Sequence, residues 1–169
     1  ELVAGVASYA LEFLRGAPPL DAVYVPIGCG SGICGLINAR DALGVATRII
    51  GVVSTNANAY ALSFAGRRAI ETESADTIAD GMAVRVPVPE ALAVILAGAE
   101  CIVEVTDAEV EAAMRHYFSD THNVVEGAGA APLAAVLQDR DRWRGKRVGL
   151  IASGGNVDRP LYQRILGSA

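Results

Sequence analysis

The stretch AVYVPIGCGSGICG, residues 22–35, decides the fold of this 169-residue chain. Residues 22–27 form a short apolar run, which is typical of a buried strand. A glycine cluster follows the run, and residues 31–43 then show a helical pattern that Gly44 closes. A strand, a glycine turn and a helix in this order are typical of a parallel sheet whose strands are joined by helices.

The rest of the chain continues this alternation. Apolar runs predict further strands at residues 48–53, 101–105 and 147–152. Periodicity and end signals predict helices at residues 1–15, 31–43, 56–66, 89–98, from a capping box at 106–109 onward, 129–138 and 160–166. Helices of this length imply crossover connections. We therefore expect an α/β fold of three layers, a mostly parallel sheet with helices on both faces, forming one domain over residues 1–169.

The composition excludes several classes of protein. The chain is 52% hydrophobic and 20% charged, which excludes a disordered protein. Its 14 Lys and Arg against 19 Asp and Glu give a net charge of −5, whereas nucleic-acid binding favours a basic face. No apolar run approaches the roughly 20 residues that span a membrane. We expect neither a nucleic-acid partner nor a membrane.

The cysteines indicate the compartment. Cys29, Cys34 and Cys101 are too few for a disulfide framework and fit no zinc spacing. Reduced, buried thiols are typical of a cytoplasmic protein. We therefore expect a cytoplasmic location.

The glycine cluster predicts an anion site. Small residues let successive backbone N–H groups point into one concavity, and the dipole of the following helix adds positive potential there. Residues 30–35 also match the dinucleotide pattern G-x-G-x-x-G. That interpretation requires an acidic residue after the next strand, which instead ends in Val52-Val53-Ser54-Thr55. A third interpretation is a tight strand-to-helix turn that binds no ligand, because such a turn is also rich in glycine and other small residues.

Two further segments carry candidate functional groups. Ser153 follows the last predicted strand, and Gly154 and Gly155 after it leave room for a flat ring. Glu126 precedes a run of small residues just before a predicted helix. Ligands of parallel sheets bind at the carboxyl ends of the strands, where two of the four strands end in glycine clusters.

Four motifs in this order make the chain resemble the C-terminal half of the fold type II pyridoxal-phosphate enzymes, specifically the serine/threonine dehydratase (threonine ammonia-lyase) and serine racemase group. The motifs are VPIGCGSG (25–32), TIADG (77–81), VEGAGA (125–130) and SGGNVD (153–158). The resemblance implies the large-domain fold of that group and the cofactor pyridoxal 5'-phosphate. It also implies β-elimination of an amino acid such as threonine or serine to a 2-oxo acid and ammonia, and a homo-oligomer, usually a dimer.

The resemblance also implies the role of each site residue. Those expected to hold the cofactor phosphate through backbone N–H groups are Gly28, Cys29, Gly30, Ser31 and Gly32. Ser153, followed by Gly154, would face the pyridine nitrogen, and Glu126 and Gly81 would lie near the ring and the imine edge. A neutral hydroxyl does not favour a positive pyridinium as a carboxylate would. The pyridine ring is then a weaker electron sink, which favours prompt loss of the β-hydroxyl.

The resemblance places the Schiff-base lysine of the group outside this chain. Thirteen of the 14 basic residues are arginines, and the only lysine is Lys146. It lies in a polar turn that enters the last strand from its amino end, which is the wrong end for a ligand. We therefore expect the chain alone to be inactive, as the C-terminal part of a longer enzyme. Glu1 already lies inside a helical pattern, which also indicates a longer parent protein.

A metal site and two other functions complete the expectations. Some members of the group bind a divalent cation through a Glu and an Asp after the second strand. The matching positions here are Val53 and Ala59, so we expect no metal, and an ordered ion at Ala57 would contradict this. The alternatives are a non-catalytic module that binds a phosphorylated ligand through residues 28–35 and, less favoured, a dinucleotide-binding domain.

Overall fold

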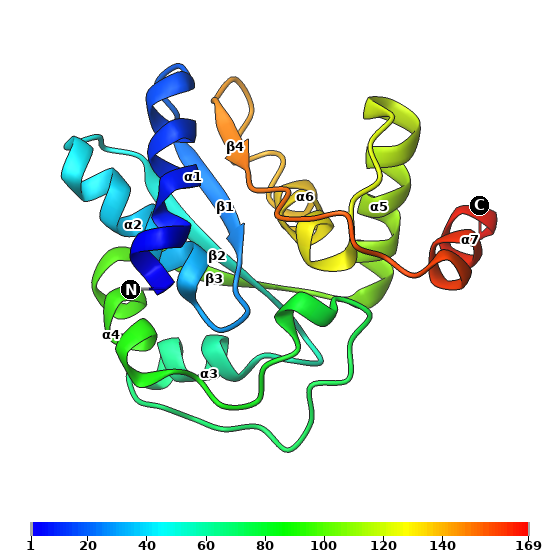
Figure 1. The fold of residues 1–169 in the computed structure, drawn as a ribbon, viewed down its shortest axis with the longest axis horizontal. Coiled ribbons are helices and arrows are strands. Elements are labelled where there is room, and N and C mark those ends of the chain that lie inside the picture. Colours follow the sequence, from blue (N-terminus) through cyan, green and yellow to red (C-terminus); the bar gives the residue numbers. More distant parts are fainter. Residues whose placement is uncertain (1, 169) are drawn as a thin grey trace.

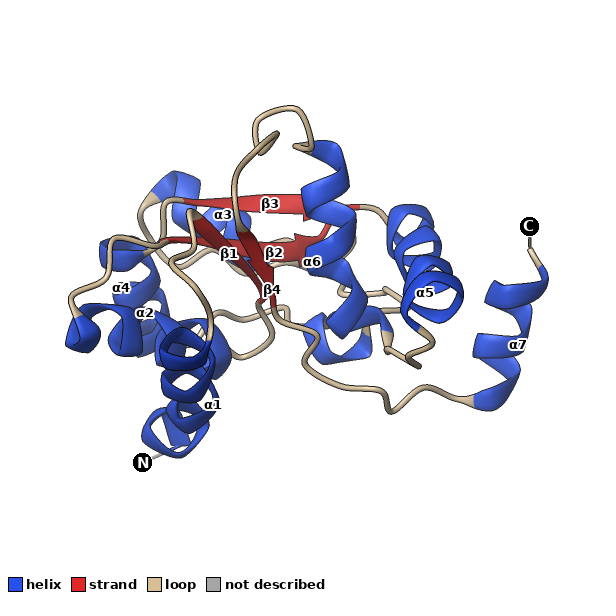
Figure 2. Ribbon diagram, turned by 90° about the horizontal axis from the view of Figure 1, so that it is seen from above, coloured by secondary structure: helices blue, strands red, loops and turns tan. Residues whose placement is uncertain are grey.

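The computed structural model describes residues 2–168 and shows an α/β fold (Figures 1 and 2). Four parallel strands form one sheet in the order β3-β2-β1-β4. The strands are β1 Ala22–Pro26, β2 Arg48–Ser54, β3 Cys101–Val105 and β4 Val148–Leu150. The expected fold class is confirmed.

The helices form the two outer layers. They are α1 Leu2–Gly16, α2 Ser31–Leu43, α3 Ala59–Gly66, α4 Pro89–Gly98, α5 Asp107–Thr121, α6 Gly127–Gln138 and α7 Arg159–Gly167, with a 3-10 turn η1 at Asp80–Met82. Helices α1, α2 and α4 lie on one side of the sheet and α5 and α6 on the other (Figure 2). None of the helices within residues 2–168 is long and apolar enough to cross a membrane.

The central strand β1 supplies both cores. Ala22 and Tyr24 belong to the core under α5 and α6, whereas Val23 and Val25 belong to the core under α1 and α2. All four are at most 1% exposed. This explains the uninterrupted apolar run, because successive strand side chains point to opposite faces and both faces are covered.

The predicted boundaries differ from the structure in a few places. Helix α3 begins at Ala59 rather than 56, because the Asn56 N–H bonds to the Ser54 hydroxyl at 3.1 Å and holds a turn. Helix α6 begins at Gly127 rather than 129, and strand β4 covers only residues 148–150. The first helix is present from Leu2, and Glu1, which the sequence placed in it, lies outside the described residues.

The capping box that the sequence predicts is confirmed. The Thr106 hydroxyl accepts from the Glu109 N–H at 3.3 Å, and the Glu109 carboxylate accepts from the Thr106 N–H at 2.7 Å. Both backbone donors are among those that a helix start leaves without partners. Helix α5 therefore begins at a fixed point, directly after strand β3.

Candidate functional site

A cavity of about 700 Å³ lies at the carboxyl edge of the sheet. It collects residues from α1, the end of β1, the start of α2, η1, the start of α6 and the segment after β4. Its lining is Val6, Tyr9, Val25, Pro26, Gly28, Cys29, Gly30, Ser31, Gly32, Gly81, Glu126, Ala128, Ile151, Ala152 and Ser153. The position agrees with the rule that ligands of parallel sheets bind beyond the carboxyl ends of the strands.

The structure brings the sequence-predicted site residues together. Eight of the nine line this cavity: Gly28, Cys29, Gly30, Ser31, Gly32, Gly81, Glu126 and Ser153. The ninth, Gly154, lies directly behind Glu126. Its carbonyl oxygen accepts the Glu126 N–H at 3.0 Å, and a Cβ on it would lie 2.5 Å from Glu126 Oε1.

Close packing explains two glycines of the turn at residues 28–32. A Cβ on Gly28 would overlap the carbonyl oxygen of Gly81, so the two backbones are in direct contact. Gly30 has a φ of +95°, and a Cβ there would lie 2.7 Å from Ala91 Cβ. A larger residue at either position would displace a neighbouring segment.

The turn presents hydrogen-bond donors to the cavity. Within residues 2–168, the N–H groups of Gly28, Cys29 and Gly30 have no acceptor. Helix α2 starts at Ser31, so the N–H groups of its first turn also lack intrahelical partners, and Gly30 provides no side-chain cap. Donors gathered at a helix N-terminus favour an anion, and a phosphate group fits them.

Asp107, the first residue of α5, holds the segment that carries Gly81. Its Oδ1 accepts from the Thr77 hydroxyl at 2.5 Å and from the Ser54 hydroxyl at 3.4 Å. Its Oδ2 accepts from the Ile78 N–H at 3.2 Å and from the Asn56 amide at 3.4 Å. One carboxylate thus ties the ends of two chain segments to a helix start, where negative charge is favoured. The sequence identified Asp107 only as a member of a capping box.

Two tyrosine hydroxyls hold the carbonyls of the turn, and sequence reasoning missed both. The Tyr9 hydroxyl donates to the Gly32 carbonyl at 3.0 Å, and burial raises the pKa of Tyr9 to about 12. The Tyr60 hydroxyl donates to the Cys29 carbonyl at 3.0 Å. Tyr9 shares a helix face with Val6, which the helical spacing could have indicated. No local signal marks Tyr60.

The rest of the cavity lining combines small residues with two polar side chains, Glu126 and Ser153. Gly81, Ala128 and Ala152 bring only small side chains to it. Glu126 occupies the N-cap position of α6, but its side chain makes no capping hydrogen bond, and Ser153 follows the last strand and is exposed. In the described part of the chain neither the Ser153 hydroxyl nor the Glu126 carboxylate has a hydrogen-bond partner, so both are available to a ligand.

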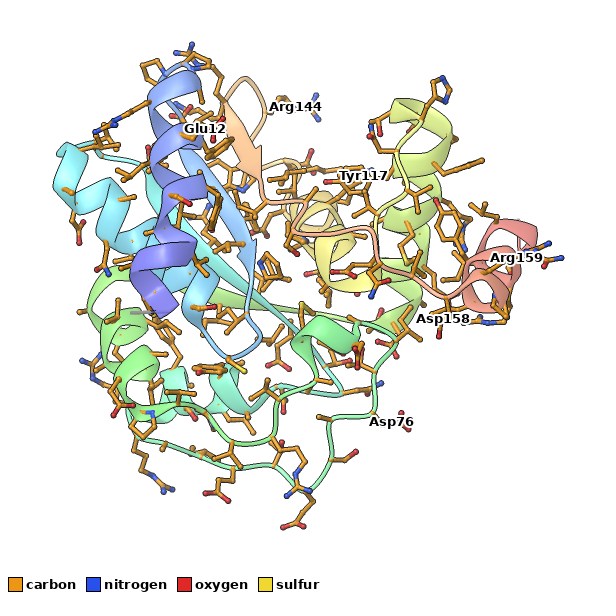
Figure 3. The ribbon with its side chains drawn as sticks, viewed as in Figure 1. Glu12, Asp76, Tyr117, Arg144, Asp158 and Arg159 are labelled. Carbon is orange, nitrogen blue, oxygen red and sulfur yellow. The ribbon has the colours of Figure 1, made fainter. Side chains whose placement is uncertain are left out.

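Lys146 lies at the other edge of the sheet. It precedes β4, its side chain is 56% exposed, and its Nζ pairs with Asp21 Oδ1 at 3.8 Å. Arg144 of the same turn lies beyond the amino end of β4, away from the end of the sheet at which β1 leads into the glycine turn (Figures 1 and 3). The prediction that Lys146 is a solvated turn residue remote from the ligand site is confirmed.

The two positions that the resemblance matched to metal ligands are both apolar. Val53 is 1% exposed in β2, and Ala59 begins α3 and is fully buried. Glu104, the residue of β3 that pairs with Val53, accepts from the Asn58 amide at 3.0 Å. Among the residues that the structure describes, no group of three or more His, Cys, Asp or Glu could hold a metal ion.

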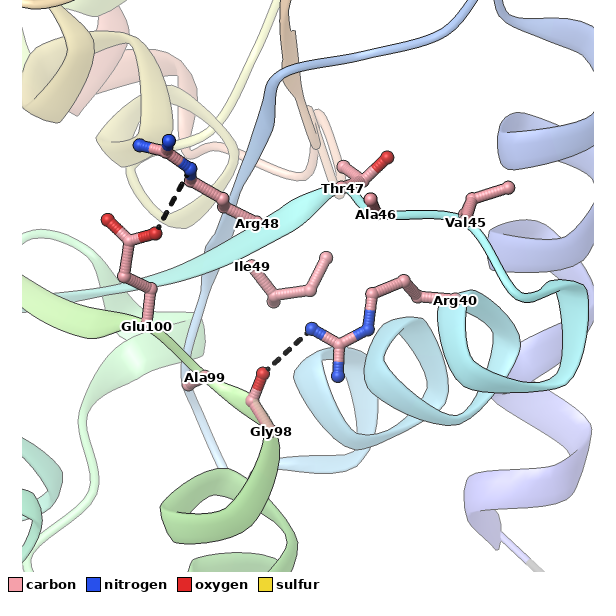
Figure 4. A pocket seen from close by; sticks show the side chains of 9 residues that line it. All are labelled: Arg40, Val45, Ala46, Thr47, Arg48, Ile49, Gly98, Ala99 and Glu100. Atoms are coloured by element: carbon pink, nitrogen blue, oxygen red, sulfur yellow. Dashed lines mark hydrogen bonds and ion pairs between the residues drawn. The ribbon is translucent and has the colours of Figure 1, made fainter.

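A second cavity, of about 300 Å³, lies at the amino ends of β2 and β3 (Figure 4). Its charged groups are already paired: Arg40 donates to the Gly98 carbonyl at 3.0 Å, and Arg48 lies 3.4 Å from Glu100. It contains none of the sequence-predicted site residues.

Comparison with known proteins shows which proteins this chain resembles. The model of the family described as "Pyridoxal-phosphate dependent enzyme" matches residues 1–154. An L-threonine ammonia-lyase of Thermotoga maritima is 32% identical over 165 residues, which are 98% of this chain and 41% of that protein. A catabolic L-threonine dehydratase of Staphylococcus aureus is 36% identical over 160 residues, 93% of this chain and 46% of that protein. A serine racemase structure from maize has a TM-score of 0.88 at 30% identity and covers 98% of this chain and 52% of that one. The chain therefore spans about half the length of the relatives it matches.

Proposed function

The chain belongs to the family of pyridoxal-phosphate-dependent enzymes, and we propose that it is the C-terminal, cofactor-binding domain of a longer enzyme. We propose that this longer enzyme deaminates a β-hydroxy amino acid. The cofactor of the family is pyridoxal 5'-phosphate. One observation carries the proposal: four motifs that lie far apart in the sequence, at 28–32, 81, 126 and 153, line a single cavity.

The residues of the cavity fit this cofactor. The free N–H groups of Gly28, Cys29 and Gly30 and the start of α2 suit the phosphate, as argued above. Small side chains at Gly81, Ala128 and Ala152 leave space for a flat ring. Ser153 would face the ring nitrogen, and Glu126 would lie near the ring edge.

The reaction that we propose removes the α-hydrogen and the β-hydroxyl of threonine or serine, with a 2-oxo acid and ammonia as net products. When bound, pyridoxal phosphate supplies the electron sink that makes the α-hydrogen acidic. The residues of this chain bind and orient. The glycine turn fixes the phosphate, and the neutral Ser153 hydroxyl leaves the ring nitrogen without a countercharge, which favours elimination of the hydroxyl.

The names of the relatives support deamination. Two of them are named for threonine ammonia-lyase or dehydratase activity. Racemisation is the second candidate, supported by the maize serine racemase structure. We further propose that the enzyme works in the cytoplasm as a homo-oligomer, with an amino acid as its substrate and without a metal at Val53 and Ala59.

We propose that residues 1–169 alone are inactive. The single lysine, Lys146, pairs with Asp21 at the edge of the sheet opposite to the cavity. A group that bonds covalently to the cofactor and moves the α-proton must therefore come from outside these residues.

The test compares the full-length protein with residues 1–169. Each protein is incubated with pyridoxal phosphate and reduced with borohydride, and its intact mass is measured by mass spectrometry. Each is also assayed for the formation of 2-oxo acid from threonine and from serine. The proposal expects a reduced adduct and 2-oxo acid from the full-length protein only. A full-length protein that forms no adduct would contradict it, and racemised serine without 2-oxo acid would favour the second candidate.

A further inference from the structure

Tyr60 lies directly beneath the phosphate-binding turn without reaching the cavity. It projects from α3, is 1% exposed and is not among the residues that line the cavity. A Cβ on Gly30 would lie 3.1 Å from its hydroxyl oxygen. Tyr60 therefore touches the core side of the turn, while the other side of the turn faces the ligand space.

The direction of the Tyr60 hydroxyl proton follows from its two partners. The Val88 N–H lies 3.0 Å from the hydroxyl oxygen and can only donate, so the hydroxyl accepts there. Its own proton is left for the Cys29 carbonyl oxygen, also at 3.0 Å. Burial raises the pKa of Tyr60 and outweighs the Val88 bond, which lowers it, so this proton is retained at neutral pH.

The bond to Cys29 determines where the next donor points. The Cys29 carbonyl and the Gly30 N–H belong to one planar trans peptide, and they point in opposite directions. Because the carbonyl points to Tyr60 in the core, the N–H points to the opposite side. Gly30 lines the cavity on that side, and its N–H has no acceptor within residues 2–168.

We propose that Tyr60 is a positioning residue that locks the peptide between Cys29 and Gly30 with its N–H toward the cofactor phosphate. The inference rests on the proposed function, since it assumes a phosphate in the turn. Without the hydroxyl, the Cys29 carbonyl loses its buried partner, and a rotated peptide presents an oxygen where the anion requires a donor.

The chain offers a matched control for the loss of a buried hydroxyl. Tyr24 is fully buried, and its hydroxyl also bonds two partners, donating to Asp139 and accepting from Trp143. It does not line the cavity. Tyr24→Phe therefore matches Tyr60→Phe in chemistry and number of lost bonds but leaves the turn unchanged.

The experiment separates the phosphate from the rest of the cofactor. Full-length wild type, Tyr60→Phe and Tyr24→Phe are titrated with pyridoxal phosphate and with pyridoxal, which lacks the phosphate, and both dissociation constants are measured by absorbance. We expect Tyr60→Phe to weaken pyridoxal phosphate binding about tenfold with pyridoxal binding unchanged. Tyr24→Phe should leave both unchanged.

The outcomes are distinguishable. The role of Tyr60 is overturned if Tyr60→Phe keeps the wild-type ratio of the two dissociation constants, for pyridoxal phosphate and for pyridoxal. The same conclusion follows if the variant loses affinity for both ligands equally. A wild type that does not prefer pyridoxal phosphate overturns the proposed function and the inference with it. If Tyr60→Phe does not fold, the amide spectrum of wild type labelled with ¹⁵N-glycine decides: the Gly30 resonance must respond to pyridoxal phosphate, and its failure to respond overturns the inference.

Discussion

The carbonyl oxygen of Gly81 occupies the place that a Cβ of Gly28 would take. This contact joins the glycine turn at residues 28–32 to the segment that Asp107 holds, and it is made by backbone atoms on both sides. Backbone atoms have no rotamers through which to yield, so a side chain at Gly28 would have to displace a whole chain segment.

Gly28→Ala is expected to lower stability by about 1–3 kcal/mol and to weaken pyridoxal phosphate binding, because the new methyl group displaces Gly81. Gly32→Ala is the control, because its Cβ would meet only the Tyr9 hydroxyl at 3.9 Å inside helix α2. There alanine should be neutral or stabilise the protein by up to about 1 kcal/mol. Urea unfolding measures both, and equal losses would contradict the contact.

Asp107→Ala is expected to lower the free energy of unfolding by about 2–3 kcal/mol, because the Thr77 hydroxyl and the Ile78 N–H lose their shared acceptor. Asp107→Asn should cost less. Its amide can turn the oxygen toward the Ile78 N–H and the NH₂ toward the Thr77 and Ser54 hydroxyls, which can accept. Urea unfolding with pyridoxal phosphate titration checks this order. An Asn variant as harmful as the Ala variant would show that the charge at the start of α5, which both substitutions remove, dominates over the hydrogen bonds.

The capping box of α5 predicts how the stability of the protein depends on pH. Burial acts to raise the pKa of Glu109, but the hydrogen bonds from Thr106 and Gln138 outweigh it, and the net pKa is lowered from its ordinary 4.5. A depressed carboxyl pKa contributes stability above the unfolded value, and this contribution is lost as the pH falls through the folded value. Thr106→Ala should cost about 1 kcal/mol at pH 7.

The difference in free energy of unfolding between Thr106→Ala and wild type should therefore become smaller below pH 4.5, because Glu109 becomes protonated there. Urea unfolding at pH 7 and at successively lower pH measures this gap. Ser8→Ala, far from the capping box, should show no such pH dependence. A gap that is constant down to the acid transition would contradict the role of the carboxylate.

The raised pKa values of two tyrosines predict how the free energy of unfolding falls at alkaline pH. Burial raises the pKa of both Tyr9 and Tyr24 from 10.0 to about 12. Between these values the unfolded chain releases the protons and the folded chain keeps them, so the free energy of unfolding falls as the pH rises from 10 to 12. Unfolding at several alkaline pH values should show a shallower fall in Tyr24→Phe, and an identical slope would contradict the shift.

Tyr24→Phe should also cost about 1–2 kcal/mol at neutral pH, because the Trp143 N–H and the Asp139 carboxylate lose a buried partner. Its unfolding at pH 7 is the reference for the alkaline series. Retained stability would show that the two partners find water instead.

Thiol labelling reports whether a phosphate ligand occupies the cavity. Cys29 is exposed in the turn, whereas burial raises the pKa of the Cys34 and Cys101 thiols. Iodoacetamide should modify Cys29 first, since the thiolate is the nucleophile. Pyridoxine 5'-phosphate, which carries no aldehyde, should slow this modification. Cys29→Ser identifies the labelled site, and a rate independent of the ligand would contradict phosphate binding at the turn.

The elements that could be predicted from the sequence are those with local causes. The apolar run of β1 reflects burial on both faces, and the capping box at Thr106 and Glu109 lies within four residues. The glycine turn was recognisable because positive φ and close backbone contact both select glycine. These features place the cavity at the correct edge of the sheet.

The supporting contacts could not be predicted, because their partners are distant in the chain. Tyr60 acts on Cys29, 31 residues earlier, and Asp107 acts on Thr77, 30 residues earlier. Each has an unremarkable place in its own helix. The start of α3 was missed for the same reason, since Asn56 is held in a turn partly by the distant Asp107.

The cavity is lined by residues from position 6 to position 153, and no single segment encloses it. A ligand there binds only when α1, the sheet and the segment after β4 are assembled together, so binding free energy adds directly to the free energy of unfolding. Ligand binding and assembly are therefore expected to depend on each other: a molecule with any one of these segments detached would lose the ligand, and with it the ligand's protection against unfolding.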